Sequence, residues 1–408
     1  STMPLIKPFA GLRPSPGQAS AVAAPPYDVL TSDEARVRAA GKPWSFLHIS
    51  KPEIDLPPGT DPFAPQVYRK AAENLEKMLA AGILRRDPKP CYYAYRLTMG
   101  SHVQTGLVAA ASVAAYDANR IRRHELTRPD KEDDRVRQIE ALNAQTGPVL
   151  LAYPPAAAVD ALLLQAASGT PDADVTAEEG IRHTLWVIRD APLIADLSAA
   201  FDAMPALYIA DGHHRSAAAS RVAASRQGAG ESGYFLSVIF PHHQMRILDY
   251  NRVVKDLNGL SEDAFLARLA QNFTVTPSAA QVKPARPGEF GMYLGGRWLS
   301  LVIDPSLIPN ADPVARLDVS LLTEFLLGPL LGIHDLRRDK RIDFVGGMRG
   351  LGELEKRVEC GEMAVAFALY PTQMEDLMAV ADAGEVLPPK TTWFEPKLAD
   401  GLVSHVID

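Results

Sequence analysis

Cysteine is scarce in this sequence, which has two, Cys91 and Cys360, in 408 residues. They are far apart and too few to form the disulfide framework of a small secreted protein. Residues 3–8 also lack the apolar stretch of a secretory signal peptide. We therefore expect a protein of a reduced compartment, the cytoplasm.

Long hydrophobic runs and an excess of basic charge are missing as well. The best apolar run, 325–333, is interrupted by Gly328, Pro329 and Gly332 and is too short to span a membrane. Lysine and arginine number 42 against 49 aspartates and glutamates, which gives a formal net charge of −7. We therefore expect no membrane partner, and no DNA partner bound through a broad basic surface.

The chain is long enough for two or three domains, and 47% hydrophobic residues can fill a large core. Segments of helical spacing alternate with short apolar runs, which predicts a mixed α/β fold with both parallel and antiparallel pairing. We expect helices from Thr31 onward and at 66–81, 133–146, 156–167, 193–204, 216–224, 262–272, 319–331 and 372–383. We expect strands at 44–49, 91–99, 104–116, 148–153, 184–188, 206–210, 234–240, 291–294, 298–303, 342–345 and 363–369.

The most informative motif is DGHHR, residues Asp211–Arg215, which lies between the apolar run 206–210 and an alanine-rich helix. The N-terminus of a helix offers free N–H groups and partial positive charge, and so binds anions. Gly212 lets the backbone approach a ligand, and Arg215 carries a guanidinium that matches phosphate oxygens. The motif therefore predicts a phosphate-binding turn. The alternative is an ordinary turn, in which Asp211 caps the helix and the histidines lie on the surface.

A second polar segment, 121–135, contains His124 and Glu125. Such a dense charge run is also typical of a solvated loop. The segment is not a zinc-protease signature, because Arg128 stands where the second histidine would be. The elements after this segment are more informative: a helix that we expect to end at Gly147, the strand 148–153, and later the strand that leads into DGHHR.

This order of elements resembles the ParB/sulfiredoxin-like catalytic core. Within that superfamily it is most similar to the free-serine kinases, which phosphorylate L-serine with a nucleoside di- or triphosphate. The resemblance covers roughly residues 113 to 225, with an insertion at 154–205. The whole chain is also similar to the bacterial family called domain of unknown function 1015. The motifs that carry this second resemblance are at 7–9, 24–29, 45–49, 207–215, 250–255 and 387–392.

The resemblance implies an architecture and a reaction. It implies a phosphate-binding core at 113–249, with an α/β segment at 1–112 packed on it and an α/β domain at 250–408. It implies a nucleotide-dependent kinase with ATP or ADP and Mg²⁺ as cofactors, and with L-serine or a similar hydroxyl compound as substrate.

The resemblance also assigns residues. Glu125 would be the general base, and Asp211 and His214 would be catalytic. The residues expected to bind phosphate or nucleotide are Gly212, His213, His214, Arg215 and Ser216. Asp211 or Glu125 would anchor the metal ion.

Further residues are candidates for contacts with substrate or for support of the site. Tyr27 and Asp28 follow two prolines that hold them on a stiff loop, although a packed N-terminal arm explains them equally well. Lys390 and Lys397 could fold back toward phosphate or lie in a solvated tail. His124 and Thr127 flank Glu125.

Two other functions stay open. One is a nucleotide-binding switch or scaffold of the ParB kind without catalysis. A predicted strand at 234–240 follows the motif where such a protein would continue into a DNA-reading helix-turn-helix, which argues against it. The other is a metal-dependent hydrolase built from the His/Asp cluster, which requires three convergent ligands.

Overall fold

The computed structural model describes residues 4–408; residues 1–3, the start of the first predicted segment, lie outside the described residues. The contacts of the chain form two compact units, one up to residue 245 together with 396–408, and the other at 246–395. This division differs from the expected segments 1–112, 113–249 and 250–408. Strand β5 (His102–Ser112) pairs with β12 (Tyr234–Pro241) in one sheet, and the last residues return to the first unit.

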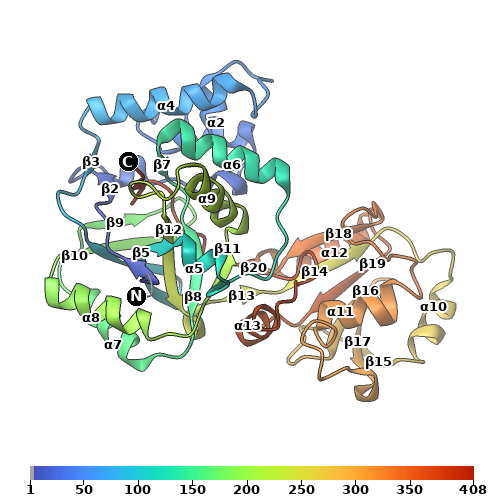
Figure 1. Ribbon diagram of the computed structural model, residues 1–408. Coiled ribbons are helices and arrows are strands. Elements are labelled where there is room, and N and C mark those ends of the chain that lie inside the picture. Colours follow the sequence, from blue (N-terminus) through green and yellow to red (C-terminus); the bar gives the residue numbers. More distant parts are fainter. Residues whose placement is uncertain (1–3) are drawn as a thin grey trace. The chain divides into compact units, whose positions relative to one another are not determined.

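A nine-stranded sheet organises the first unit, in the order β6-β11-β8-β12-β5-β4-β10-β9, with β1 also pairing with β5 (Figure 1). The pairings of β11 with β6 and of β12 with β8 are parallel, and the others are antiparallel. The predicted mixed α/β class is confirmed. The remaining strands of this sheet are β1 (Ile6–Lys7), β4 (Tyr92–Met99), β6 (Ile121–Arg122), β8 (Val149–Tyr153), β9 (Ala173–Thr176), β10 (Arg182–Ile188) and β11 (Leu207–Asp211).

Helices cover this sheet. One hydrophobic cluster joins the strands to α5, α7, α8 and α9 through side chains such as Tyr116, Leu163, Phe201 and Ala219. Helix α4 packs on α6, which in turn packs on α9, as Figure 1 shows. The helices are α1 (Ala19–Val22), α2 (Ser32–Ala39), α3 (Leu47–Ser50), α4 (Pro65–Ala80), α5 (Val113–Asp117), α6 (Pro129–Leu142), α7 (Ala157–Ala166), α8 (Ala191–Asp202) and α9 (His213–Ser225). Short strand pairs complete the unit: β2 (Leu12–Pro14) with β3 (Leu84–Arg86), and β7 (Ala144–Gln145) with β21 (His405–Val406).

The second unit contains a six-stranded sheet in which each pairing is antiparallel, in the order β15-β17-β16-β19-β14-β18. Its strands are β14 (Tyr250–Val254), β15 (Phe273–Ser278), β16 (Glu289–Leu294), β17 (Arg297–Ile303), β18 (Ile342–Gly346) and β19 (Val365–Leu369), and a separate pair joins β13 (Ile247–Leu248) to β20 (Trp393–Phe394). Its helices are α10 (Glu262–Leu269), α11 (Asp318–Leu322), α12 (Leu351–Glu359) and α13 (Met374–Asp382).

Most predicted elements are confirmed, including the hairpin of β4 and β5 and the capping box with which Thr31 begins α2. The strand predicted at 44–49 is wrong, because Leu47 and Ile49 enter the core from the short helix α3 and Phe46 enters it from the residue before that helix. An apolar run of that length does not distinguish a strand from a helical turn. The expected end of the charged helix at Gly147 is also wrong. Helix α6 ends at Leu142, because the next residue, Asn143, takes the left-handed conformation that stops a helix.

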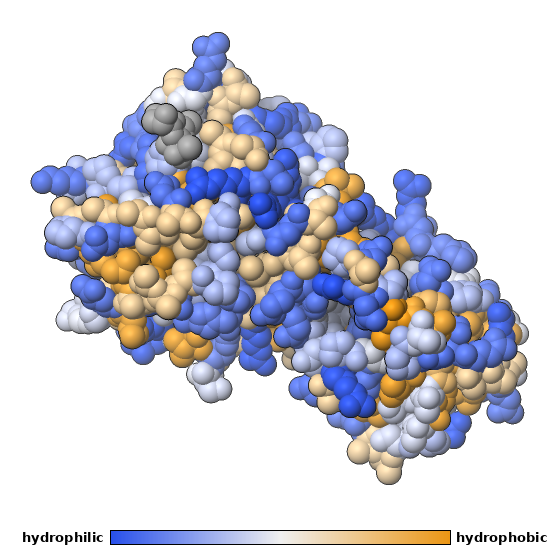
Figure 2. All heavy atoms as spheres, turned by 60° about the horizontal axis from the view of Figure 1, so that its bottom comes forward, coloured by the Kyte–Doolittle hydropathy of each residue, from blue (hydrophilic) through white to orange (hydrophobic). Residues whose placement is uncertain are grey.

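Among the helices of residues 4–408, none has both the length and the hydrophobicity needed to cross a membrane. Figure 2 shows a face on which hydrophobic side chains form small patches between hydrophilic ones.

The turn between β11 and α9 depends on glycine. Gly212 has a φ of +95°, in the left-handed region that side chains disfavour. A Cβ atom there would lie 3.2 Å from Nη1 of Arg215 and 3.3 Å from Cα of Val149. The chain can therefore turn sharply from the sheet into α9 only with a residue that lacks a side chain.

Replacing Gly212 by alanine should lower the free energy of unfolding more than replacing another glycine of positive φ. We expect Gly212→Ala to lower the free energy of unfolding by about 1–2 kcal/mol through the backbone and by about 1–3 kcal/mol more through crowding. Gly17→Ala is the matched control, because Gly17 has a φ of +83° and no atom within 4 Å of its missing Cβ. Urea denaturation of both variants measures the difference. Equal losses would contradict the close approach at Gly212.

Candidate active site

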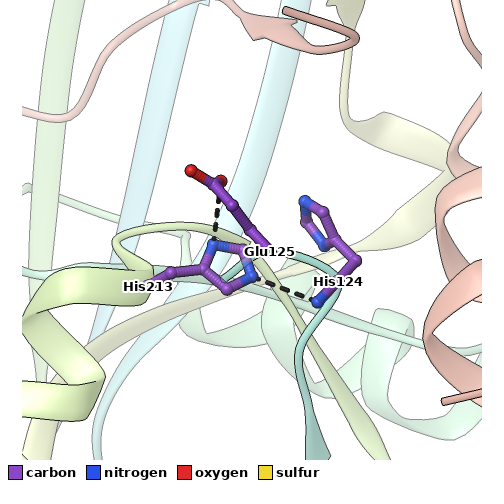
Figure 3. Close-up of side chains that lie close together, drawn as sticks. All are labelled: His124, Glu125 and His213. Carbon is purple, nitrogen blue, oxygen red and sulfur yellow. Dashed lines mark hydrogen bonds and ion pairs between the residues drawn. The ribbon is translucent and has the colours of Figure 1, made fainter. Parts of the chain in front are cut away.

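The loop after β6 brings His124 and Glu125 to the N-terminus of α9. This happens because β6 and β11 are parallel neighbours, so the chain leaves both strands at the same edge of the sheet. An oxygen of Glu125, Oε2, lies 3.4 Å from Nδ1 of His213, the first residue of α9 (Figure 3). The structure thus brings together the two polar segments that the sequence singled out.

His213 lies between two groups of this loop, as Figure 3 shows. Its side chain is buried, and Nε2 accepts a hydrogen bond from the backbone N–H of His124 at 3.3 Å. A ring nitrogen that accepts carries no proton, so the neutral ring carries its proton on Nδ1, which faces Glu125. Burial lowers the pKa of His213 well below its ordinary value, and nearby positive charge acts in the same direction. The ring is therefore neutral, and its Nδ1–H faces the carboxylate of Glu125.

His214 makes a matching contact at the other end of the loop. Its Nε2 accepts the backbone N–H of Arg128 at 3.2 Å. Burial, followed by the charge of Lys131, lowers the pKa of His214, while Glu132 acts in the opposite direction. The two adjacent histidines therefore hold the segment from His124 to Arg128.

Three donor groups of this region could in principle take a metal ion. Ligand atoms of His124, Glu125 and His213 all lie within 4.8 Å of one another, and Nδ1 of His124 is buried without a hydrogen-bond partner. However, a metal ion on Nδ1 of His213 would move the ring proton to Nε2, opposite the N–H of His124. The hydrogen bond on His213 therefore opposes a metal centre, although the types of donor suit one.

Asp211 and Ser216 have other contacts than the sequence predicted. Oδ1 of Asp211 accepts the backbone N–H of Gly212 at 2.9 Å, and α9 has no side-chain cap. The ordinary capping role for Asp211 is therefore wrong. Ser216 is fully buried and donates to the carbonyl of His213 at 3.0 Å, so its hydroxyl is directed into the helix rather than to a ligand at the turn.

Arg215 is not an open phosphate fork in this structure. Its Nη1 donates to the carbonyl of Pro148 at 2.5 Å, and its Nη2 lies 3.3 Å from Oδ2 of Asp28. Its Nε is buried without a hydrogen-bond partner. Burial acts to lower the pKa of Arg215, but the negative charges around it, Asp28 first, more than offset this and raise it. The guanidinium is thus a cation on a side chain that is only 14% exposed, held by Asp28 and by the carbonyl of Pro148.

Two further charged groups, Arg135 and Asp400, belong to the same region as Arg215. The guanidinium of Arg135 lies 3.8 Å from the centre of the Tyr27 ring, a cation–π contact. Asp400 is 2% exposed, and burial raises the pKa of its carboxyl to about 7, although Arg215 and Arg135 act to lower it. Tyr27 and Asp28 are candidates from the sequence, but Asp400 is not. The one feature of the sequence that could have indicated Asp400 is that it is the sole charged residue in the apolar run 398–403.

The remaining predicted residues are Thr127, Lys390 and Lys397. The hydroxyl of Thr127 donates to the carboxylate of Glu132, at the start of α6. Lys397 is half-buried in the returning segment of the first unit. Lys390 belongs to the second unit, where its charge acts on Asp343.

The family model described as "Protein of unknown function (DUF1015)" matches residues 6–320. The chain belongs to the DUF1015 family. No curated protein sequence is a significant match to this DUF1015 protein. The family resemblance seen in the sequence is confirmed, and the ParB/sulfiredoxin-like core stays a prediction.

Solved structures similar to this DUF1015 protein share little sequence with it. A free serine kinase in complex with AMP is 14% identical, with 72% of this chain and 92% of that chain covered and a TM-score of 0.37. A conserved hypothetical protein from Pyrococcus furiosus is 16% identical, with coverages of 73% and 95% and a TM-score of 0.36. SbnI with a C-terminal truncation, from Staphylococcus aureus, is 13% identical, with coverages of 73% and 87% and a TM-score of 0.38.

The buried carboxyl of Asp400 should make stability depend on pH. Its pKa is higher in the folded protein than in the unfolded chain, so the folded state binds more protons and stability falls as pH rises from about 4 to about 7. We expect Asp400→Asn to remove the decrease in the free energy of unfolding that Asp400 causes over this pH range. This contribution is on the order of 1–4 kcal/mol. Denaturant titrations of both proteins at several pH values measure it. Asp408→Asn is the control, because Asp408 is exposed and its pKa is lowered. Parallel stability curves for Asp400→Asn and the parent would refute the assignment.

Proposed function

We propose that this DUF1015 protein is a nucleotide-dependent kinase of a small hydroxyl compound. The observation that carries the proposal is the distance of 3.4 Å between the carboxylate of Glu125 and the ring of His213. It puts a candidate base beside the turn at which a helix N-terminus offers an anion site. The resemblance of the sequence to free-serine kinases makes L-serine the first acceptor to test.

Phosphate binding is the task of the turn itself. Helix α9 begins without a side-chain cap, so its first N–H groups are available to an anion together with the positive end of the helix dipole. The missing side chain of Gly212 lets phosphate approach this backbone. In this proposal Arg215 acts as a positive charge close to the turn, held in place by Asp28 and by the carbonyl of Pro148.

Glu125 is suited to accept the proton of the acceptor. Its side chain is 49% exposed, so a substrate can reach it. The neighbouring ring of His213, at 3.4 Å, orients the carboxylate. In the proposed step the hydroxyl oxygen of the acceptor attacks the terminal phosphorus and its proton passes to Glu125. The bond from that phosphorus to the bridging oxygen breaks, and the shortened nucleotide leaves with the electron pair. Such a reaction asks the protein mainly for positioning and for neutralisation of charge.

Mg²⁺ fits this chemistry through oxygen ligands. When bound, it screens the negative charge of the polyphosphate. The carboxylates of Asp211 and Glu125 are the side chains of the site with suitable oxygens, whereas the imidazoles suit softer ions. Asp211 ends β11, directly before the turn.

The decisive experiment separates binding from chemistry. Glu125→Gln keeps the shape of the side chain and removes the base, so we expect nucleotide affinity close to that of the parent and a loss of phosphoryl transfer of about 10²-fold or more. Parent and variant are assayed with ATP or ADP, Mg²⁺ and a panel of amino acids, with the phosphorylated product detected by mass. Glu140→Gln is the control, since Glu140 pairs with Arg226 on the exposed side of α6.

The possible outcomes are distinct. Full activity of Glu125→Gln would show that the base lies elsewhere. Nucleotide binding by the parent without transfer to any acceptor would favour the switch or scaffold instead.

A further inference from the structure

The two histidines of the turn make the same contact with the same loop. Nε2 of His213 accepts the N–H of His124, and Nε2 of His214 accepts the N–H of Arg128. Adjacent residues of a helix project about 100° apart around its axis. The loop therefore crosses the first turn of α9 and is bonded on two sides of it, directly before Pro129 begins α6.

These contacts require a particular state of each ring. Only a neutral imidazole with its proton on Nδ1 can accept at Nε2. A protonated ring, or the opposite tautomer, would point an N–H at the N–H of the backbone. The charged and titratable groups that face His213 are Glu125, His124, His214 and Arg123, and those that face His214 are Lys131, Glu132, Arg128 and Arg215.

We propose that His213 and His214 are positioning residues whose Nδ1–H tautomers, selected by two backbone amides, hold Glu125 over the N-terminus of α9. His213 positions Glu125 through two contacts. Its Nε2 accepts the backbone N–H of His124 in the loop, and its Nδ1–H faces the carboxylate of Glu125 itself. His214 binds the far end of the loop. The importance of Glu125 rests on the proposed function, whereas the tautomers and the loop contacts do not.

The tautomers can be observed directly. Long-range proton–nitrogen spectra of the full chain with ¹⁵N-labelled histidine distinguish the two tautomers and the protonated ring. His213→Gln and His214→Gln assign the signals. We expect both rings to be neutral with the proton on Nδ1 at pH 7, with or without Zn²⁺. An Nε2–H tautomer or a charged ring at either position would overturn the proposal. So would conversion of His213 by Zn²⁺, which would make the cluster of His124, Glu125 and His213 a metal site.

Hydrogen exchange tests whether the rings hold the loop. Loss of one hydrogen bond should speed exchange of the Arg128 amide by about fivefold or more in His214→Leu. His214→Gln should restore slow exchange, because its side-chain oxygen can accept the same N–H. For His213→Leu and His213→Gln, the exchange rate of the His124 amide is measured in the same way. Unchanged exchange in the leucine variants, or no rescue by glutamine, would contradict the proposal.

Activity gives a separate readout at His213. His213→Gln keeps an acceptor for the His124 amide but loses the Nδ1–H that faces Glu125. We therefore expect kcat to fall with little change in KM for the nucleotide. Changes of equal size in kcat and in KM would contradict the role of His213 in orienting Glu125. If the parent transfers no phosphate to any acceptor, the proposed function fails, while the spectra and the exchange rates still decide the state of the two rings.

Discussion

The parallel pairing of β6 with β11 is the constraint on which the candidate site depends. β6 is only two residues long, but it directs the following loop to the edge of the sheet where α9 begins. Every contact between Glu125, His124 and the histidines of the turn depends on that direction. A candidate base and a helix N-terminus, distant in the sequence, thereby share one small region.

The sequence predicted the secondary structure of this region, but not the side-chain contacts within it. Asp-Gly followed by an alanine-rich stretch has the local chemistry of a strand, a sharp turn and a helix, and the structure has them. The contacts of Arg215 could not be predicted, because they involve Asp28 and Pro148, which are remote in the chain. The tautomer of His213 was equally hidden, since it depends on one backbone N–H of another loop. Periodicity reports local structure, whereas these contacts are decided by tertiary packing.

The same limit explains the errors in the elements. The run at 44–49 has the composition of a strand, yet Leu47 and Ile49 reach the core from a short helix. Asn143 ends α6 in a left-handed conformation that asparagine adopts more readily than most residues. Its side chain also accepts from Arg226, a partner that no local pattern reveals. Within the site, Asp400 escaped notice because one acidic residue in a tail is ordinary until its burial is known.

The return of residues 396–408 to the first unit has a consequence for the order of folding. The second unit is inserted within the first, so β21 and Asp400 leave the ribosome after all of 246–395. Strand β7 then has no β21 to pair with, and Arg215 lacks the buried counter-charge of Asp400, until residues 396–408 have been synthesised. The inserted unit has all its strands earlier and can fold first. The surroundings of the turn are thus completed only after the inserted unit, by residues 396–408.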